Sequence, residues 1–73
     1  MASYSTVYRV GGVHSGHCKA IVSEALRGLD SVRTVRMEVS TGLLTLDTVT
    51  EPDDALVSET VEEAGYDYLG RAG

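Results

Sequence analysis

Two histidines and the chain's single cysteine fall within five positions of one another. His14, His17 and Cys18 lie in the segment that runs from position 13 to position 18, and the chain contains no other histidine. A thiolate is a strong ligand for soft metal ions such as Cu(I), and imidazole binds several of the same ions. The segment therefore predicts a soft-metal site centred on Cys18, with His17 and His14 as candidate further ligands.

The predicted position of Cys18 at the start of a helix favours its thiolate form. Ser15 is a typical N-cap residue, so residues 16–18 would form the first turn. Unpaired backbone N–H groups and the positive end of the helix dipole lower the pKa of a thiol there, and Lys19 adds a positive charge. The alternative is that Cys18 fills the buried stripe of the helix, as free cysteines often do.

The neighbouring polar residues also admit simple structural roles. His17 is adjacent to Cys18, and side chains one residue apart on a helix diverge. Joint binding of one ion would therefore need the turn to loosen or a second chain to contribute. His14 lies in a loop, where it can fold toward Cys18 or stay solvated. The simplest role of Ser15 is the N-cap, because a hydroxyl is a poor ligand for Cu(I).

Six alternating elements are predicted to hold this segment. Strands are expected at 4–10, 32–39, 43–48 and 66–69, the first helix at 15–27, and the second between a start signal at 50–54 and Gly65. Gly28 is expected to close the first helix in the left-handed conformation. With right-handed crossovers this order predicts an α+β, ferredoxin-like βαββαβ sandwich, in which two helices cover one face of a four-stranded antiparallel sheet.

The predicted core is aliphatic with some tyrosine, because the chain has no Phe and no Trp. Its 73 residues make a single domain, 1–73. Apolar residues at periods of two and of three to four predict the inward positions Thr6, Tyr8, Val10, Cys18, Ile21, Val22, Ala25, Leu26, Leu29, Val35, Met37, Val39, Leu44, Leu46, Leu56, Val57, Thr60, Val61 and Ala64.

Charge and composition narrow the classes of function. The net charge is −5, with +2 in residues 1–40 and −7 in residues 41–73. This polarity suits oriented docking to a protein partner, although it also fits an ordinary solvated surface. It argues against nucleic acid, which requires a concentrated basic surface. We expect no membrane insertion and a cytoplasmic location, because there is neither a long apolar run nor a signal-peptide pattern.

The segment Gly12-Val13-His14-Ser15-Gly16-His17-Cys18 resembles the metal-binding loop of bacterial copper chaperones and of the heavy-metal-associated (HMA) domains of copper-transporting ATPases. That loop reads Gly-Met-x-Cys-x-x-Cys. The resemblance extends over 6–69 and includes Glu63-Ala64-Gly65-Tyr66-Asp67, which is close to a recurrent ending in the family. It implies the same fold, Cys18 as a Cu(I) ligand, and Tyr66 as a residue that lies near the metal loop.

Ser15 is the main departure from the family pattern. It occupies the position of the first metal-binding cysteine, so one chain cannot form the usual site with two thiolates. Serine is also the closest isostere of cysteine, and engineered variants often replace one by the other. Ser15 is therefore either the native residue or an engineered replacement of a cysteine. Val13 stands where the family usually has methionine, and both residues are apolar anchors.

The resemblance implies a Cu(I) chaperone, or a single-cysteine variant of one, that passes copper to a partner by exchange of thiolate ligands. The implied partner is a copper-transporting P-type ATPase or its soluble metal-binding domain. Two chains facing each other could pool their ligands in a metal-bridged homodimer that holds Cu(I) or Zn(II). The alternative is a metal-independent interaction module that kept the fold and lost the full site. We expect no enzyme, because no carboxylate near the Cys-His segment could orient a histidine base.

Overall fold

The structure is a computed structural model and describes residues 3–72. Its elements follow the predicted order. They are β1 (Tyr4–Gly11), α1 (Gly16–Arg27), β2 (Val32–Glu38), β3 (Leu43–Thr48), α2 (Asp54–Glu63) and β4 (Asp67–Arg71). The strands form one antiparallel sheet in the order β2-β3-β1-β4.

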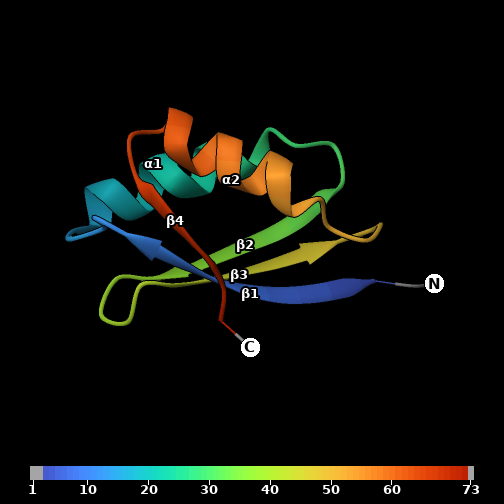
Figure 1. Ribbon diagram of the computed structural model, residues 1–73, viewed down its shortest axis with the longest axis horizontal. Coiled ribbons are helices and arrows are strands. Elements are labelled where there is room, and N and C mark those ends of the chain that lie inside the picture. The colour runs from blue at the N-terminus through green and yellow to red at the C-terminus, as the bar shows by residue number, and fades with distance from the viewer. Residues whose placement is uncertain (1–2, 73) are drawn as a thin grey trace.

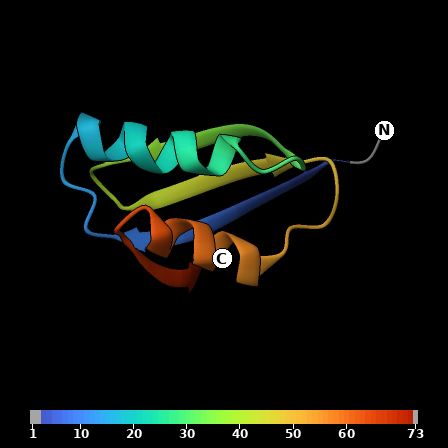
Figure 2. The same ribbon diagram turned by 90° about the horizontal axis from the view of Figure 1, so that it is seen from above.

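Both helices cover the same face of the sheet (Figure 1), where they lie side by side (Figure 2). α1 contacts β2 at one edge of the sheet, and α2 contacts β4 at the other edge. This arrangement confirms the ferredoxin-like sandwich. It also brings the start of α1 and the end of α2 to the same end of the molecule (Figure 2).

The core lies between the sheet and the helices. The alternation predicted for the strands is confirmed, because Tyr8, Val10, Met37, Leu44 and Leu46 are all buried. The helices contribute a shorter stripe than predicted, and its fully buried apolar members are Val22, Leu26, Val57 and Val61.

Two predicted core positions are wrong. Ile21 is 37% exposed and Leu56 is 42% exposed. Each residue directly precedes a buried valine, Val22 or Val57, and one helical step rotates a side chain by about 100°. The sheet therefore covers the valine, while its neighbour lies on the flank of the helix.

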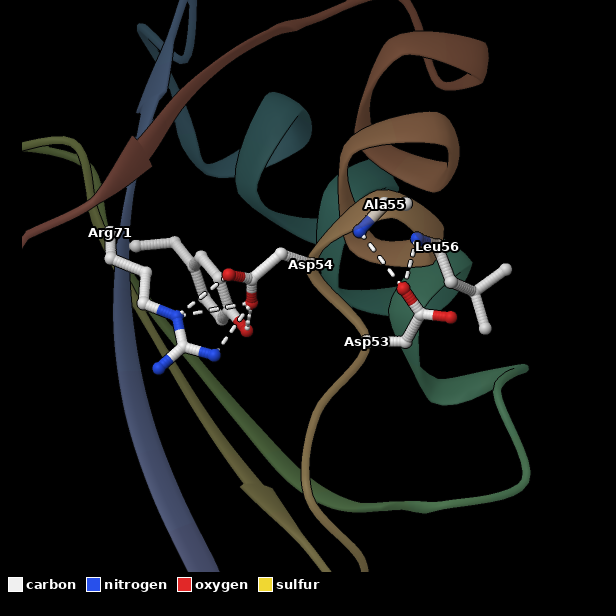
Figure 3. Close-up of polar contacts among 6 residues, drawn as sticks. Asp53, Asp54, Ala55, Leu56 and Arg71 are labelled. Carbon is white, nitrogen blue, oxygen red and sulfur yellow. Dashed lines mark hydrogen bonds and ion pairs between the residues drawn. The ribbon is translucent and has the colours of Figure 1, made fainter.

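The helix ends differ in their agreement with the prediction. Asp53 caps α2, because its carboxylate accepts hydrogen bonds from the backbone N–H groups of Ala55 at 3.0 Å and Leu56 at 3.3 Å (Figure 3). The left-handed closure expected at Gly28 is wrong, because its φ is −72°. The Gly28 N–H instead donates to the carbonyl of Ala25 at 3.3 Å, which continues the chain through a tight right-handed turn.

The last strand is shifted from the predicted range 66–69 and carries a bulge. Tyr8 pairs with Arg71 and Val10 pairs with Tyr68, so two residues of β4 lie opposite the single residue between Tyr8 and Val10. Gly70 lies in the bulge with φ of +100°, a conformation that glycine adopts without the steric penalty of a side chain. The extra residue turns Arg71 to the same side of the sheet as Tyr8.

Candidate metal site

The loop between β1 and α1 is anchored by one buried residue. Val13 is only 6% exposed and belongs to the core, whereas His14, Ser15, Gly16 and His17 are all exposed. The anchoring role predicted for Val13 is therefore present. The residues that follow it are held at the surface at one end of the sandwich.

Ser15 organises the first turn of α1. Its backbone is extended, with φ of −151°, and its hydroxyl oxygen accepts a hydrogen bond from the Cys18 N–H at 3.3 Å. The same hydroxyl donates to the Cys18 sulfur at 3.5 Å. The N-cap predicted at Ser15 is thus confirmed, and this serine also contacts the thiol that the sequence analysis assigned as a ligand.

Cys18 is half-buried and combines features of both interpretations offered from the sequence. Its side chain packs against the core, yet the sulfur stays within reach of polar groups in the loop. A hydrogen bond from the Tyr66 hydroxyl, a second from the His14 backbone and a third from the Ser15 hydroxyl lower the pKa of Cys18 to about 7. The lowered pKa favours the thiolate form of Cys18.

Hydrogen bonds, and not the neighbouring lysine, account for this acidity. Lys19, which the sequence analysis expected to contribute, is not among the principal causes of the lowered pKa of Cys18. The contribution of His14 was missed, because it comes from the backbone and not from the imidazole. Sequence patterns report side-chain types, so only the conformation of the loop could reveal a backbone donor.

Tyr66 is placed beside the loop by the end of α2. Gly65 adopts φ of +96°, and the Tyr66 N–H donates to the carbonyl of Val61 at 3.2 Å, a Schellman closure. A side chain at Gly12 would lie 3.5 Å from the Tyr66 ring, which shows how closely the ring approaches the loop. The hydrogen bond to Cys18 is the largest cause of a raised pKa for the Tyr66 hydroxyl.

Both candidate histidines, His14 and His17, lie at the surface and close to Cys18 in sequence. Within residues 3–72 no three side chains of His, Cys, Asp or Glu lie close enough together to hold a metal ion. His14 precedes the first turn of α1, and His17 lies within that turn. The arrangement therefore offers one thiol with a lowered pKa, together with two imidazoles that are nearby in sequence.

Comparison with known proteins decides the family. Residues 7–67 match the heavy-metal-associated domain, which is most of the chain. The chain belongs to this family. The copper chaperone CopZ from two strains of Staphylococcus aureus is 29% identical over 68 residues, covering 86% of this chain and 94% of CopZ.

Solved structures of HMA domains share the fold. A CopZ metallochaperone aligns with a TM-score of 0.85 at 24% identity, over 90% of this chain and all of that one. The yeast copper transporter domain Ccc2A aligns with a TM-score of 0.85 at 19% identity, over 99% and 97% of the two chains. The N-terminal domain of PacS from Synechocystis PCC6803 aligns with a TM-score of 0.82 at 14% identity, over 96% and 98%.

Membership in the family fixes the general class of function. HMA domains of the copper chaperone type are metal carriers and not enzymes, as the sequence analysis expected. Neither helix in the described part of this HMA domain is long and apolar enough to cross a membrane.

Proposed function

We propose that this HMA domain is a copper carrier in which Cys18 provides the essential thiolate for Cu(I). The observation that carries the proposal is the half-buried thiol at the exposed end of the fold, with a pKa lowered to about 7 by Tyr66, the His14 backbone and Ser15. A soft thiolate binds a soft monovalent ion strongly, and the exposed loop leaves that ion accessible to an attacking ligand.

Copper bound at Cys18 would be released by ligand exchange, because a Cu(I) ion with few ligands can accept another thiolate. A thiolate of the partner attacks the bound Cu(I) and forms a new Cu–S bond. The bond from copper to Cys18 then breaks, and Cys18 leaves as a thiolate without any change in the oxidation state of copper. Because Ser15 supplies no second thiolate, the second ligand of the resting site would be His17, His14, a small thiol or a second chain.

A metal-bridged homodimer is the simplest way for two such chains to complete the site. Two loops facing each other would pool two Cys18 thiolates and up to four imidazoles. Such a set suits bridged Cu(I) ions or one tetrahedral Zn(II). Sedimentation velocity with increasing Cu(I) tests this point, since an unchanged monomer at saturating Cu(I) would contradict it.

The proposed recipient is a copper-transporting P-type ATPase or its soluble metal-binding domain, in the cytoplasm. The similarity of this chain to the copper chaperone CopZ and to the yeast copper transporter domain Ccc2A supports the proposal. Domains of the same shape can present their loops to one another, so that thiolates from both sides reach one ion.

An anaerobic Cu(I) titration against a competing chelator tests the central claim. The native chain is compared with Cys18→Ala, His17→Ala and His14→Ala. We expect loss of binding in Cys18→Ala and a smaller weakening when the histidine that completes the site is removed. Retention of full affinity by Cys18→Ala would refute the proposal.

A metal-independent interaction module is the second candidate, and the presence of Ser15 at the position of the first cysteine favours it. In that case Cys18→Ala would leave binding to the partner intact, and Cu(I) would not change the affinity. The copper carrier predicts the opposite dependence on Cu(I).

A further inference from the structure

The face of the sheet that the helices leave uncovered is polar around Asp47. Buried and half-buried residues alternate along β3, and the buried ones face the helices, so Asp47 points to the opposite face (Figure 1). Asp47 pairs with Ser5 of β1 on one side and with Thr34 of β2 on the other. A row made of one carboxylate between two hydroxyl groups therefore crosses this face.

Two adjoining hollows lie over this row. The larger has a volume of about 360 Å³ and is lined by Ser5, Thr34, Val35, Arg36, Thr45 and Asp47. The smaller has a volume of about 300 Å³ and is lined by Ser3, Arg33, Thr34 and Asp47. Because Thr34 and Asp47 line both, the two hollows form one site, which we call the sheet hollow. Volumes of this size are at the lower end of the range for sites that bind small molecules.

A second bulge in the sheet brings Arg33 into the sheet hollow. The register of β2 against β3 shifts between Val32 and Thr34, so Arg33 is an extra residue there. Strict alternation would turn the Arg33 side chain toward the helices. The bulge instead places it beside Thr34 and Asp47, which line the smaller hollow with it.

The charged groups of the sheet hollow are poorly matched by one another. Arg33 and Arg36 are exposed, and within residues 3–72 neither forms an ion pair. The Thr34 hydroxyl donates to Oδ2 of Asp47 at 2.7 Å, and no other side chain in this part of the protein donates to that carboxylate. The hollow therefore holds two cationic donors, one on each side of a carboxylate that can accept a further hydrogen bond.

We infer that the sheet hollow binds a sugar phosphate. Guanidinium groups bind phosphate oxygens through strong charge-assisted hydrogen bonds, so Arg33 and Arg36 would hold the phosphate. Asp47 would accept a hydrogen bond from a hydroxyl group of the sugar.

The mixed charge of the hollow selects for both parts of such a ligand. A simple anion is repelled by Asp47, and a neutral sugar leaves both guanidinium groups without an anionic partner. The hollow lies on the face of the sheet opposite α1 and Cys18, so this inference does not depend on the proposed binding of copper.

Ribose 5-phosphate serves as the probe, and ribose and inorganic phosphate are its matched controls. The full chain is titrated without metal at constant pH and ionic strength, and backbone amide shifts are followed by NMR. We expect ribose 5-phosphate to shift amides of residues 33–36 and 45–47, and to bind at least about tenfold more tightly than inorganic phosphate. No shift of these amides, or equal affinity for the two phosphates, would overturn the inference.

Arginine variants separate the defined site from general attraction to positive charge. Arg33→Gln and Arg36→Gln are each expected to weaken binding of ribose 5-phosphate by at least about threefold. Arg9→Gln is the control, because Arg9 pairs with Leu43 and is about 13 Å from Asp47 along the sheet. It should change the affinity by less than about twofold, since salt screens charges at that distance. Equal weakening by Arg9→Gln would refute a defined site.

Asp47→Ala tests the sugar part of the ligand. Removing the carboxylate takes away both a repulsive charge and the acceptor for the sugar. Inorganic phosphate should therefore bind more tightly, while the preference for ribose 5-phosphate should fall below about threefold. A merely structural role of Asp47 would weaken both ligands alike, and that result would overturn its assignment. Cys18→Ala should bind ribose 5-phosphate like the native chain, so a failure of the copper proposal and a failure of this one are told apart.

Discussion

The guanidinium of Arg71 forms a bidentate ion pair with the carboxylate of Asp54. Its Nε lies 2.8 Å from Oδ2 of Asp54, and its terminal nitrogen lies 2.9 Å from Oδ1 (Figure 3). The hydroxyl of buried Tyr8 also donates to Oδ1 at 2.8 Å. This network ties the last strand to the first turn of α2 and through Tyr8 to the centre of the sheet.

The two partners of this ion pair should differ in their effect on stability. Arg71→Ala removes an exposed cation and is expected to lower the free energy of unfolding only slightly, because solvent screens exposed ion pairs. Asp54→Ala also leaves the buried Tyr8 hydroxyl without its acceptor and should cost about 2–3 kcal/mol. Urea denaturation followed by circular dichroism measures both. Equal losses in the two variants would show that Tyr8 adds nothing to the role of Asp54.

The same network predicts that the free energy of unfolding depends on pH in the acidic range. The hydrogen bonds from Arg71 and, less strongly, from Tyr8 hold the pKa of Asp54 below its ordinary value of 3.8. A carboxylate with a lowered pKa in the folded state contributes stability that is present above the unfolded pKa and is lost as the pH falls through the folded pKa. We therefore expect Asp54→Asn to reduce the loss of stability below about pH 4. Urea midpoints measured from pH 2 to pH 7 test this, and an unchanged slope would contradict it.

The bulge in β4 that brings Arg71 to Asp54 should require glycine at position 70 because of the backbone conformation alone. Its φ is +100°, and a methyl group added there would meet no atom within 4 Å. Gly70→Ala is therefore expected to cost about 1–2 kcal/mol purely through the left-handed backbone. Gly16→Ala is the control, because its added methyl also meets nothing within 4 Å and no positive φ opposes it. If both variants unfold at the same urea concentration, the bulge does not depend on glycine.

The contrast between Arg71 and Ser15 shows what the sequence could predict. Ser15 acts within its own turn, and the N-cap pattern depends on local residue types, so its role was correctly predicted. Arg71 reaches Asp54 only because a bulge reverses the alternation of β4. Such a bulge depends on how the strand pairs with β1, which no local pattern reports.

Side-chain burial was predictable in the strands, because alternate residues point to opposite faces of the sheet and only one face can be the buried one. Alternation placed Tyr8 and Leu44 in the core, because only one face of the sheet is covered by helices. On the helices, Ile21 and Leu56 extended the apolar stripe but fell on its margin. Burial there depends on the position of the neighbouring helix, which is a tertiary property.

The acidity of Cys18 should depend most on Tyr66. In the metal-free chain, Tyr66→Phe removes the largest cause of the lowered pKa and should move it from about 7 toward the ordinary 9.0. Ser15→Ala should produce a smaller rise. Because the folded pKa is below the unfolded one, the thiolate contributes stability that is fully present above pH 9 and is lost as the pH falls through about 7. Thiolate absorbance near 240 nm against pH measures the pKa directly, and Lys19→Ala should leave it unchanged.

Restoring a cysteine at position 15 should convert the site into a self-sufficient one. The Ser15 hydroxyl lies 3.5 Å from the Cys18 sulfur, so a thiol in its place would be close to a second coordination position of the same ion. Ser15→Cys should raise the affinity for Cu(I) by at least about tenfold, since two soft thiolates replace one.

The same variant should remove the need for a second chain. At one Cu(I) per chain, Ser15→Cys should sediment as a monomer under conditions in which the native chain forms a metal-bridged dimer. Ser15→Ala is the matched control: it also lacks the hydroxyl but adds no ligand, so it should keep the native affinity to within a few fold and still dimerise. A native chain that already binds Cu(I) as tightly as Ser15→Cys, and does so as a monomer, would show that His17 or His14 completes the site without a partner.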